Sequence, residues 1–384
     1  MQQQQQERAA WWLVRGPMGG DANIRRARMV VIVGLLGLVP CARAGAQSLL
    51  RTHGAYEVGA QAEWYTGSGD LNGDGRVDYL VAGYGDYPQG GIAGVVAFDG
   101  PTGSQIWATP HRTGHSITLA LSAIGDLDND GIRDVAVTSA NVGYPGIGIA
   151  DVCTFLSGAT GSYLGEIVEF HTFSVQAEFK SVLGLDDING DGVPDVLLQW
   201  TLSRYRAYSG APGHALLYDV PGSFGFTFDQ DVLDDVNGDG LRDFAVRYAS
   251  SAQPPALRVH SGATGQILYT LVNSHWLTGV NDIDGDGVGD FAAGWFGPVI
   301  GGEPYPYIAM RSGVNGALIW STTGAVPISG GGQLGLYMQS GGDVNGDGYD
   351  DISSVDERVA TGVAARIVSG RTGAVLIDID LDDV

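Results

Sequence analysis

Six acidic strings of nine residues recur along the chain, and they carry its strongest chemical signal. Each has Asp at positions 1, 5 and 9, Asn or Asp at position 3, and Gly at position 6. Side-chain oxygens at alternate positions of a tight loop suit a hard cation such as Ca²⁺. The strings are DLNGDGRVD at 70–78, DLDNDGIRD at 126–134, DINGDGVPD at 187–195, DVNGDGLRD at 235–243, DIDGDGVGD at 282–290 and DVNGDGYDD at 343–351.

We predict a Ca²⁺ site in each string, so the chain is expected to hold about six ions. Positions 1, 3 and 5 offer side-chain oxygens, position 7 offers its backbone carbonyl, and position 9 offers a further carboxylate. The Glu at position 12 of an EF-hand loop is absent, since Val81 stands there in the first string. The predicted ligands are Asp70, Asn72, Asp74, Arg76 and Asp78; Asp126, Asp128, Asp130, Ile132 and Asp134; Asp187, Asn189, Asp191, Val193 and Asp195; Asp235, Asn237, Asp239, Leu241 and Asp243; Asp282, Asp284, Asp286, Val288 and Asp290; and Asp343, Asn345, Asp347, Tyr349 and Asp351.

Simple hairpin turns or magnesium loops would account for the strings less well. The dipeptides DG and NG also mark hairpin turns, which accounts for the Gly residues but not for three acids in every copy. Mg²⁺ prefers fewer protein ligands and strict octahedral geometry. The ligand positions hold 20 of the 41 acidic residues that follow residue 46. Such crowding of like charges is costly unless a cation lies among them.

A second marker alternates with the acidic strings. It reads DGPTG at 99–103, SGATG at 157–161, SGAPG at 209–213, SGATG at 261–265, SGVNG at 312–316 and SGRTG at 369–373. Two markers in fixed alternation predict a repeat architecture.

Each repeat contains four short apolar runs separated by Gly, Pro, Asn and Asp, as at 79–82, 94–98, 105–107 and 117–120. Four strands in a repeat of this length correspond to one propeller blade, which must stack on neighbours to bury both faces. We therefore predict an all-β fold, a β-propeller of six four-stranded blades with a calcium loop in each. A seven-bladed propeller and an open β-solenoid are the alternatives.

The strings and markers resemble the FG-GAP/VCBS repeats, which also form the N-terminal propeller of integrin α subunits. The match covers roughly residues 62–380 and is specific in the metal loops. The resemblance implies calcium at Asp70, Asn72, Asp74 and Asp78 and at the equivalent positions of the other copies. The Phe-Gly and Gly-Ala-Pro strings of the family are degraded, which weakens any transfer of integrin-like partner binding.

Residues 1–46 have the order of a secretory signal peptide. Basic residues within 25–28 precede an apolar run at 29–38, and the small residues 44–46 form a cleavage site. The run is too short to span a membrane. We expect cleavage after Ala46, a propeller domain at 47–384, and a protein that is secreted, on the cell surface or periplasmic. A later translation start, at Met18 or Met29, is an alternative.

The formal net charge of −23 limits the kinds of partner that the chain is expected to bind. It argues against binding to the phosphates of nucleic acid and against docking on an anionic membrane. No apolar stretch after residue 46 is long enough to span a bilayer. We expect an extracellular protein or glycan as partner.

Four further features have both a functional and a packing interpretation. The segment AFDGPTGSQIW at 97–107 resembles the tryptophan-docking segment of quinoprotein propellers. His111 and His115 have metal-like spacing, but a surface loop explains them better than a zinc site. Cys153 lies in an apolar run that is typical of an inert core residue. Four tryptophans would form a sugar-stacking face or serve blade packing: Trp200, Trp276, Trp295 and Trp320.

The predicted function is an extracellular binding or cell-adhesion module in which calcium is structural. The alternative is an enzyme on a propeller scaffold, a polysaccharide lyase or hydrolase. The chain offers only a modest cluster for such chemistry, at Glu166, Glu169, Glu178 and Lys180. We therefore predict no catalytic residues and no organic cofactor.

Overall fold

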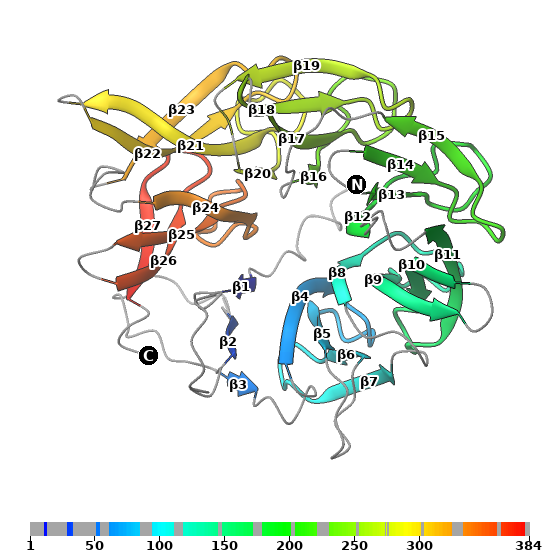
Figure 1. Ribbon diagram of the computed structural model, residues 1–384. Helices are drawn as coiled ribbons and strands as arrows, with labels where there is room; N and C mark the ends of the chain where they lie inside the picture. The colour runs from blue at the N-terminus through cyan, green and yellow to red at the C-terminus, as the bar shows by residue number, and fades with distance from the viewer. Residues whose placement is uncertain are drawn as a thin grey trace. The chain divides into compact units, whose positions relative to one another are not determined.

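A computed structural model describes most of the chain (Figure 1). Every regular element in it is a β-strand, and no helix among the described residues is long and apolar enough to cross a membrane. The chain divides into two compact units, residues 1–182 and 183–384. The described residues are 11–13, 29–33, 51–53, 61–84, 94–110, 118–144, 148–171, 179–200, 204–220, 230–250, 253–272, 274, 276–300, 303–324, 333–358 and 362–380.

The first unit contains two four-stranded antiparallel sheets, each made of consecutive strands, and a smaller sheet of three strands. The first four-stranded sheet comprises β4 (Gln61–Gly69), β5 (Asp78–Tyr84), β6 (Gly94–Phe98) and β7 (Gln105–Pro110). The second comprises β8 (Thr118–Ala123), β9 (Val135–Tyr144), β10 (Gly148–Leu156) and β11 (Tyr163–His171). The small sheet comprises β1 (Trp11–Leu13), β2 (Met29–Val33) and β3 (Arg51–His53).

The second unit repeats the same sheet four times, although its first strand begins shortly before the boundary. The third and fourth sheets comprise β12 (Phe179–Gly184), β13 (Val196–Trp200), β14 (Arg204–Tyr208) and β15 (Leu216–Val220), then β16 (Gln230–Val232), β17 (Phe244–Ser250), β18 (Gln253–His260) and β19 (Ile267–Val272). The fifth and sixth comprise β20 (Trp276–Gly279), β21 (Phe291–Ile300), β22 (Glu303–Arg311) and β23 (Leu318–Thr323), then β24 (Gln333–Ser340), β25 (Ile352–Arg358), β26 (Gly362–Val368) and β27 (Val375–Asp380).

The two sequence markers occupy fixed places in every sheet. Each acidic string connects the first strand to the second, as residues 70–78 connect β4 to β5. Each five-residue marker connects the third strand to the fourth, as residues 99–103 connect β6 to β7. In an antiparallel meander these two connections leave the sheet at the same end. The acidic string and the marker of one sheet therefore lie together.

Apolar side chains from neighbouring sheets form the cores. In the first unit, Leu80 and Val95 of the first sheet cluster with Val137 and Leu156 of the second. In the second unit, similar clusters join the third sheet to the fourth, the fourth to the fifth and the fifth to the sixth. Burying apolar area between sheets is the main favourable contribution to folding, so each sheet depends on its neighbour.

The six four-stranded sheets are the six predicted blades, so the six-bladed prediction is confirmed. Each of these sheets in the described part of the chain consists of four consecutive antiparallel strands, as a propeller blade does. The cleavage predicted after Ala46 falls outside the described residues, as does most of the signal segment, and it stays a prediction.

Candidate metal centres

The carboxylate at position 1 organises each acidic loop. In the second blade, Oδ1 of Asp126 accepts a hydrogen bond from the amide of Asp130 at 3.1 Å, and Oδ2 accepts one from Gly131 at 2.8 Å. The bonds from positions 5 and 6 to position 1 recur in all six loops. The backbone therefore wraps around this carboxylate.

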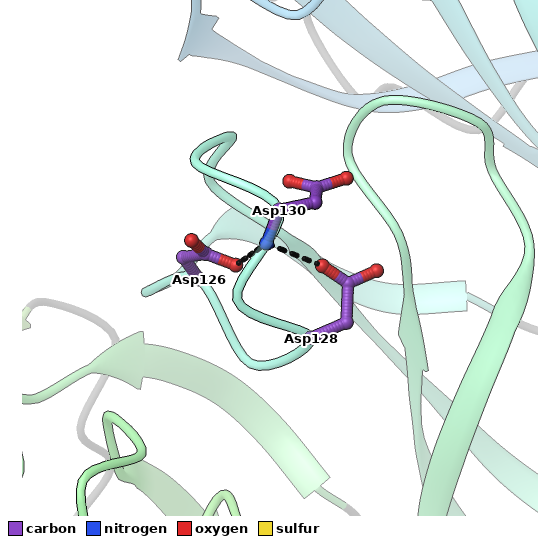
Figure 2. A group of neighbouring side chains, drawn as sticks. All are labelled: Asp126, Asp128 and Asp130. Carbon is purple, nitrogen blue, oxygen red and sulfur yellow. Dashed lines mark hydrogen bonds between the residues drawn. The ribbon is translucent and has the colours of Figure 1, made fainter.

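Positions 3 and 5 each close a further small turn. Oδ1 of Asp128 accepts from the amide of Asp130 at 3.3 Å, and Oδ1 of Asp130 accepts from Ile132 at 2.8 Å. Equivalent bonds occur in the other five loops. Such turns, in which Asp or Asn binds an amide two residues on, are a local property of these residue types. Figure 2 shows how the turns gather three carboxylates around one short coil.

Three carboxylates converge in two of the described loops, those of the second and fifth blades. One oxygen from each of Asp126, Asp128 and Asp130 lies within 4.8 Å of the others, and Asp282, Asp284 and Asp286 form an equivalent group. The other four loops carry Asn at position 3, and its Oδ1 accepts the same backbone bond. All six loops thus present only oxygen ligands at these positions, which is the donor set that Ca²⁺ prefers.

Glycine at position 6 has a structural cause. This residue has a positive φ in every loop, from 80° in Gly75 to 91° in Gly131. Position 4 is also left-handed, and there Asn129, with φ of 64°, is the one residue other than Gly. Asn tolerates this conformation better than most residues with a Cβ atom. The Gly at position 6 of every string is therefore set by the conformation of the backbone.

Position 9 has a different environment from the other acidic positions. Its Asp is fully buried in all six loops, at 0% exposure. One oxygen accepts from the amide of position 2 at 2.7–3.0 Å. The other accepts from the second residue of the five-residue marker, a Gly, at 2.9–3.1 Å. In the second and fifth blades this Asp is not part of the close carboxylate group. Position 9 therefore fastens the acidic loop to the marker of its own blade.

Burial has an electrostatic consequence at position 9. Loss of hydration raises the pKa of Asp134, Asp243, Asp290 and Asp351 to about 6, against the hydrogen bonds that lower it. The same cause raises the pKa of Asp78 and Asp195. These carboxylates therefore hold a proton more strongly than an ordinary Asp.

The marker Gly also receives a hydrogen bond from the preceding blade. Nε1 of Trp107, in β7, donates to the carbonyl of Gly158 in the second blade at 2.7 Å. A Cβ on Gly158 would lie 1.9 Å from the carbonyl oxygen of Arg133, so no other residue fits there without a shift. The equivalent donors are Tyr218 to Gly262, Tyr269 to Gly313 and Trp320 to Gly370.

Sequence reasoning missed this blade-to-blade bond because it compared tryptophans alone. The signal is the third residue of the fourth strand, which is Trp or Tyr in four blades. Gly165 and Ile377, which have no side-chain donor, stand there in the second and sixth blades. Trp107 therefore joins two neighbouring blades. This packing role accounts for the tryptophan without the resemblance to quinoprotein propellers.

Comparison with known proteins supports the fold. Residues 70–137, in the first two blades of the β-propeller, match the family described as FG-GAP-like repeat. No curated protein matches the chain.

Comparison with solved structures supports the fold and nothing further. BBS1N, crystallised in complex with ARL6DN, is 11% identical with a TM-score of 0.51, over 82% of this chain and 81% of that one. The rhamnogalacturonan lyase YesW is 16% identical with a TM-score of 0.45, over 82% of this chain and 57% of the lyase. The Dos1 propeller is 8% identical with a TM-score of 0.47, over 78% of this chain and 66% of that one. The match thus spans less than two thirds of the lyase and less than two thirds of the Dos1 chain.

The tryptophans proposed as a sugar face lie in different surroundings in the propeller. Trp276 and Trp320 pack against the core between the fifth and sixth blades. The guanidinium of Arg206 lies 4.0 Å from the centre of the Trp200 ring. The side chain of Trp295, in β21, is outside the described set. The described tryptophans therefore take part in packing, as the packing interpretation expects.

The remaining candidates are scattered or lie outside the described residues. Cys153 is free and fully buried, and burial raises the pKa of its thiol, so the predicted place in the core is confirmed. Glu166 and Glu169 lie three residues apart on β11, which directs them to opposite faces of the strand. His111, His115 and Glu178 lie outside the described residues, and the side chain of Lys180 is not described.

Proposed function

We propose that this β-propeller is an extracellular binding module whose six loops hold structural Ca²⁺. The observation that carries the proposal is the preformed geometry of the loops. In each loop, backbone amides hold the side chains of positions 1, 3 and 5 around one coil. In the second and fifth blades this brings three carboxylates together with no cationic side chain at a ligand position.

A calcium ion fits this arrangement for two reasons. The ligands are all oxygen atoms, and the close carboxylates of Asp126, Asp128 and Asp130 would repel one another without a cation. Positions 1, 3 and 5 would hold the ion through side chains, and position 7 would offer its carbonyl. When bound, the ion would cross-link positions 1 to 7 of the loop and neutralise their charge.

A structural role follows from the place of the loops in the blade. Each loop lies at the same blade end as the five-residue marker and is bonded to it through position 9. In four blades the marker accepts a hydrogen bond from the preceding blade. Calcium would therefore order the blade end at which neighbouring blades are joined.

The binding role rests on location and charge. The predicted signal segment would export the chain to a compartment with millimolar calcium or to the periplasm, and the acidic surface suits neither nucleic acid nor anionic lipid. The connections at the blade ends offer a surface for an extracellular protein or glycan. A glycan-array screen of the full chain with and without calcium tests this role, and calcium-dependent capture of one glycan class is the expected result.

Metal analysis of the full chain, dialysed against millimolar calcium, tests the sites directly. We expect about six ions per chain, and two or fewer would contradict the proposal. Two matched variants, Asp130→Asn and Asn129→Gly, separate the effect of losing a ligand from the effect of changing the loop backbone. The first variant removes one negative ligand and is expected to lose one ion. The second keeps every ligand and relieves a left-handed Asn, so it is expected to keep all ions.

A further inference from the structure

Neighbouring metal loops are joined by hydrogen bonds at two places in the second unit. The bonds connect the residue just before position 1 of one loop to position 8 of the next. Between the third and fourth blades, Asp186 accepts from the amide of Arg242 at 2.7 Å and from its Nε at 2.8 Å. Between the fifth and sixth blades, Asn281 and Asp350 occupy the same two places.

The junction between the fifth and sixth loops involves three hydrogen bonds. Oδ1 of Asn281 accepts from the amide of Asp350 at 2.9 Å, and its Nδ2 donates to the carbonyl of Gly348 at 3.0 Å. The amide of Asn281 donates to Oδ2 of Asp350 at 3.2 Å. Gly348 is position 6 of its loop, and its amide binds Asp343 at position 1. The junction therefore reaches the backbone that shapes the sixth metal loop.

At two other junctions the same two positions, the residue before position 1 and position 8 of the next loop, face each other, but one of the two residues is a glycine. Between the fourth and fifth loops, Asp234 lies against Gly289, where an added Cβ would lie 2.6 Å from the Cβ of Asp234. Between the first and second loops, Gly69 lies beside Arg133, whose Cδ is 3.9 Å from an added Cβ. In each of these pairs one partner is a glycine, so two side chains cannot bond to each other there.

We propose that the fifth and sixth loops bind calcium as a thermodynamically coupled pair through Asn281, and that the third and fourth loops do so through Asp186 and Arg242. The inference rests on the proposed calcium function. An ion that orders the fifth loop fixes Asn281, one residue before position 1, and Asn281 then holds two residues of the sixth loop in place. The second ion binds a loop that is already ordered, so its affinity rises, and the effect is reciprocal.

Tyr349 provides a reporter for the sixth loop. It is the one aromatic residue at position 7, where the other loops carry Arg76, Ile132, Val193, Leu241 and Val288. Terbium replaces calcium in oxygen sites, and a tyrosine beside the ion sensitises its luminescence. Titration of the calcium-free full chain with terbium, corrected with the variant Tyr349→Leu, therefore measures occupancy of the sixth loop alone.

The test removes the fifth site and reads the sixth. We expect D282N/D286N to raise the terbium concentration that half-saturates the sixth loop by about fivefold or more, the lower end of typical coupling. In an Asn281→Ala background, the same double substitution is expected to produce no further shift. Asp234→Ala, the equivalent change in the fourth loop, is the matched control, and in its background the fivefold shift should persist.

The outcomes separate this inference from the calcium proposal. If the sixth loop binds terbium and D282N/D286N leaves its midpoint unchanged, the coupling is overturned while the metal site stands. If the shift persists in Asn281→Ala, the coupling exists but does not pass through this residue, which overturns the assigned route. If no Tyr349-dependent luminescence appears, both the coupling and the calcium site of that loop are overturned.

Discussion

The two ends of each acidic loop use the same residue type for different purposes. At positions 1, 3 and 5, Asp and Asn are half-buried or exposed, and they accept hydrogen bonds from amides of their own loop. In the first, third and fifth blades a side chain at position 3 or 5 also bonds to the first side chain of the marker. At position 9, Asp is fully buried and binds an amide of the marker, more than ten residues away in sequence. The first end shapes a cation site, and the second end fastens that site to the blade.

This difference shows that burial and bonding partners, more than residue identity, decide what an Asp does. A carboxylate in water with neighbouring carboxylates gains from a cation. A carboxylate that is buried against two backbone amides is already satisfied, and removing it leaves those amides without partners. The two ends should therefore respond differently to calcium, to pH and to substitution.

Calcium withdrawal is expected to have the largest effect, because it acts on all six first ends at once. At about 1 mM calcium and a dissociation constant near 0.1 mM, each site contributes roughly 1.4 kcal/mol. Six independent sites contribute on the order of 8 kcal/mol, or a fall in melting temperature of roughly 15 °C on removal. Thermal melting of the calcium-free protein, with calcium and with magnesium added back, measures this. Identical curves in all three conditions would mean that the loops are not structural calcium sites.

Lowering the pH is expected to act on the second ends. In the calcium-free protein, Asp134, Asp243, Asp290 and Asp351 have a pKa of about 6, above the ordinary Asp value of 3.8. The folded state therefore binds more protons than the unfolded state between about pH 4 and 6, and stability rises as pH falls through that window. From pH 7 to pH 5 the gain is roughly 1.3 kcal/mol for each carboxylate.

Melting of the calcium-free protein at pH 5 and pH 7 measures this gain. A calcium-free protein that is less stable at pH 5 than at pH 7 would contradict the buried environment of position 9.

The sequence alone predicted the blade count and the loops, because both depend on local rules. Gly at position 6 and Asp at positions 1 and 5 are set by backbone conformation and by bonds within a few residues, so they repeat visibly. Strand order followed as well, since each blade is a meander of consecutive strands.

The sequence could not show the environment of position 9 or the blade-to-blade bonds. Asp134 looks like a fourth ligand in the string, and its amide partner Gly158 lies 24 residues further on. Trp107 and Tyr218 have the same partner type but different side chains, so a search for identical residues does not connect them. Contacts between distant segments leave no fixed spacing in one sequence.

Substitution of a single Asp at position 9 is expected to lower stability by less than calcium removal or the pH change alters it. Asp134→Ala leaves the amides of Leu127 and Gly158 without their acceptor, which should lower stability by about 3 kcal/mol with or without calcium. Asp130→Ala, at an exposed position of the same loop, should matter mainly in calcium, by roughly the 1.4 kcal/mol of one site. Denaturant unfolding of both variants in calcium and without it measures the four values. Equal calcium dependence in the two variants would remove the distinction between the ends.

The smallest expected effect concerns the bond that connects a second end to the preceding blade. The hydroxyl of Tyr218 donates to the carbonyl of Gly262 at 2.7 Å, and the amide of Gly262 binds Asp243 at position 9. Tyr218→Phe keeps the ring against Gly265 but removes the donor, so stability should fall by about 1 kcal/mol. Tyr307→Phe on β22 is the control, because its hydroxyl makes no hydrogen bond with the described residues. The loss in Tyr218→Phe should be equal in calcium and in its absence, because the bond lies on the fastened side of the loop. A loss that appears only in calcium would show that the fourth metal loop and its blade junction act as one unit, and the comparison between the two ends would then fail for that blade.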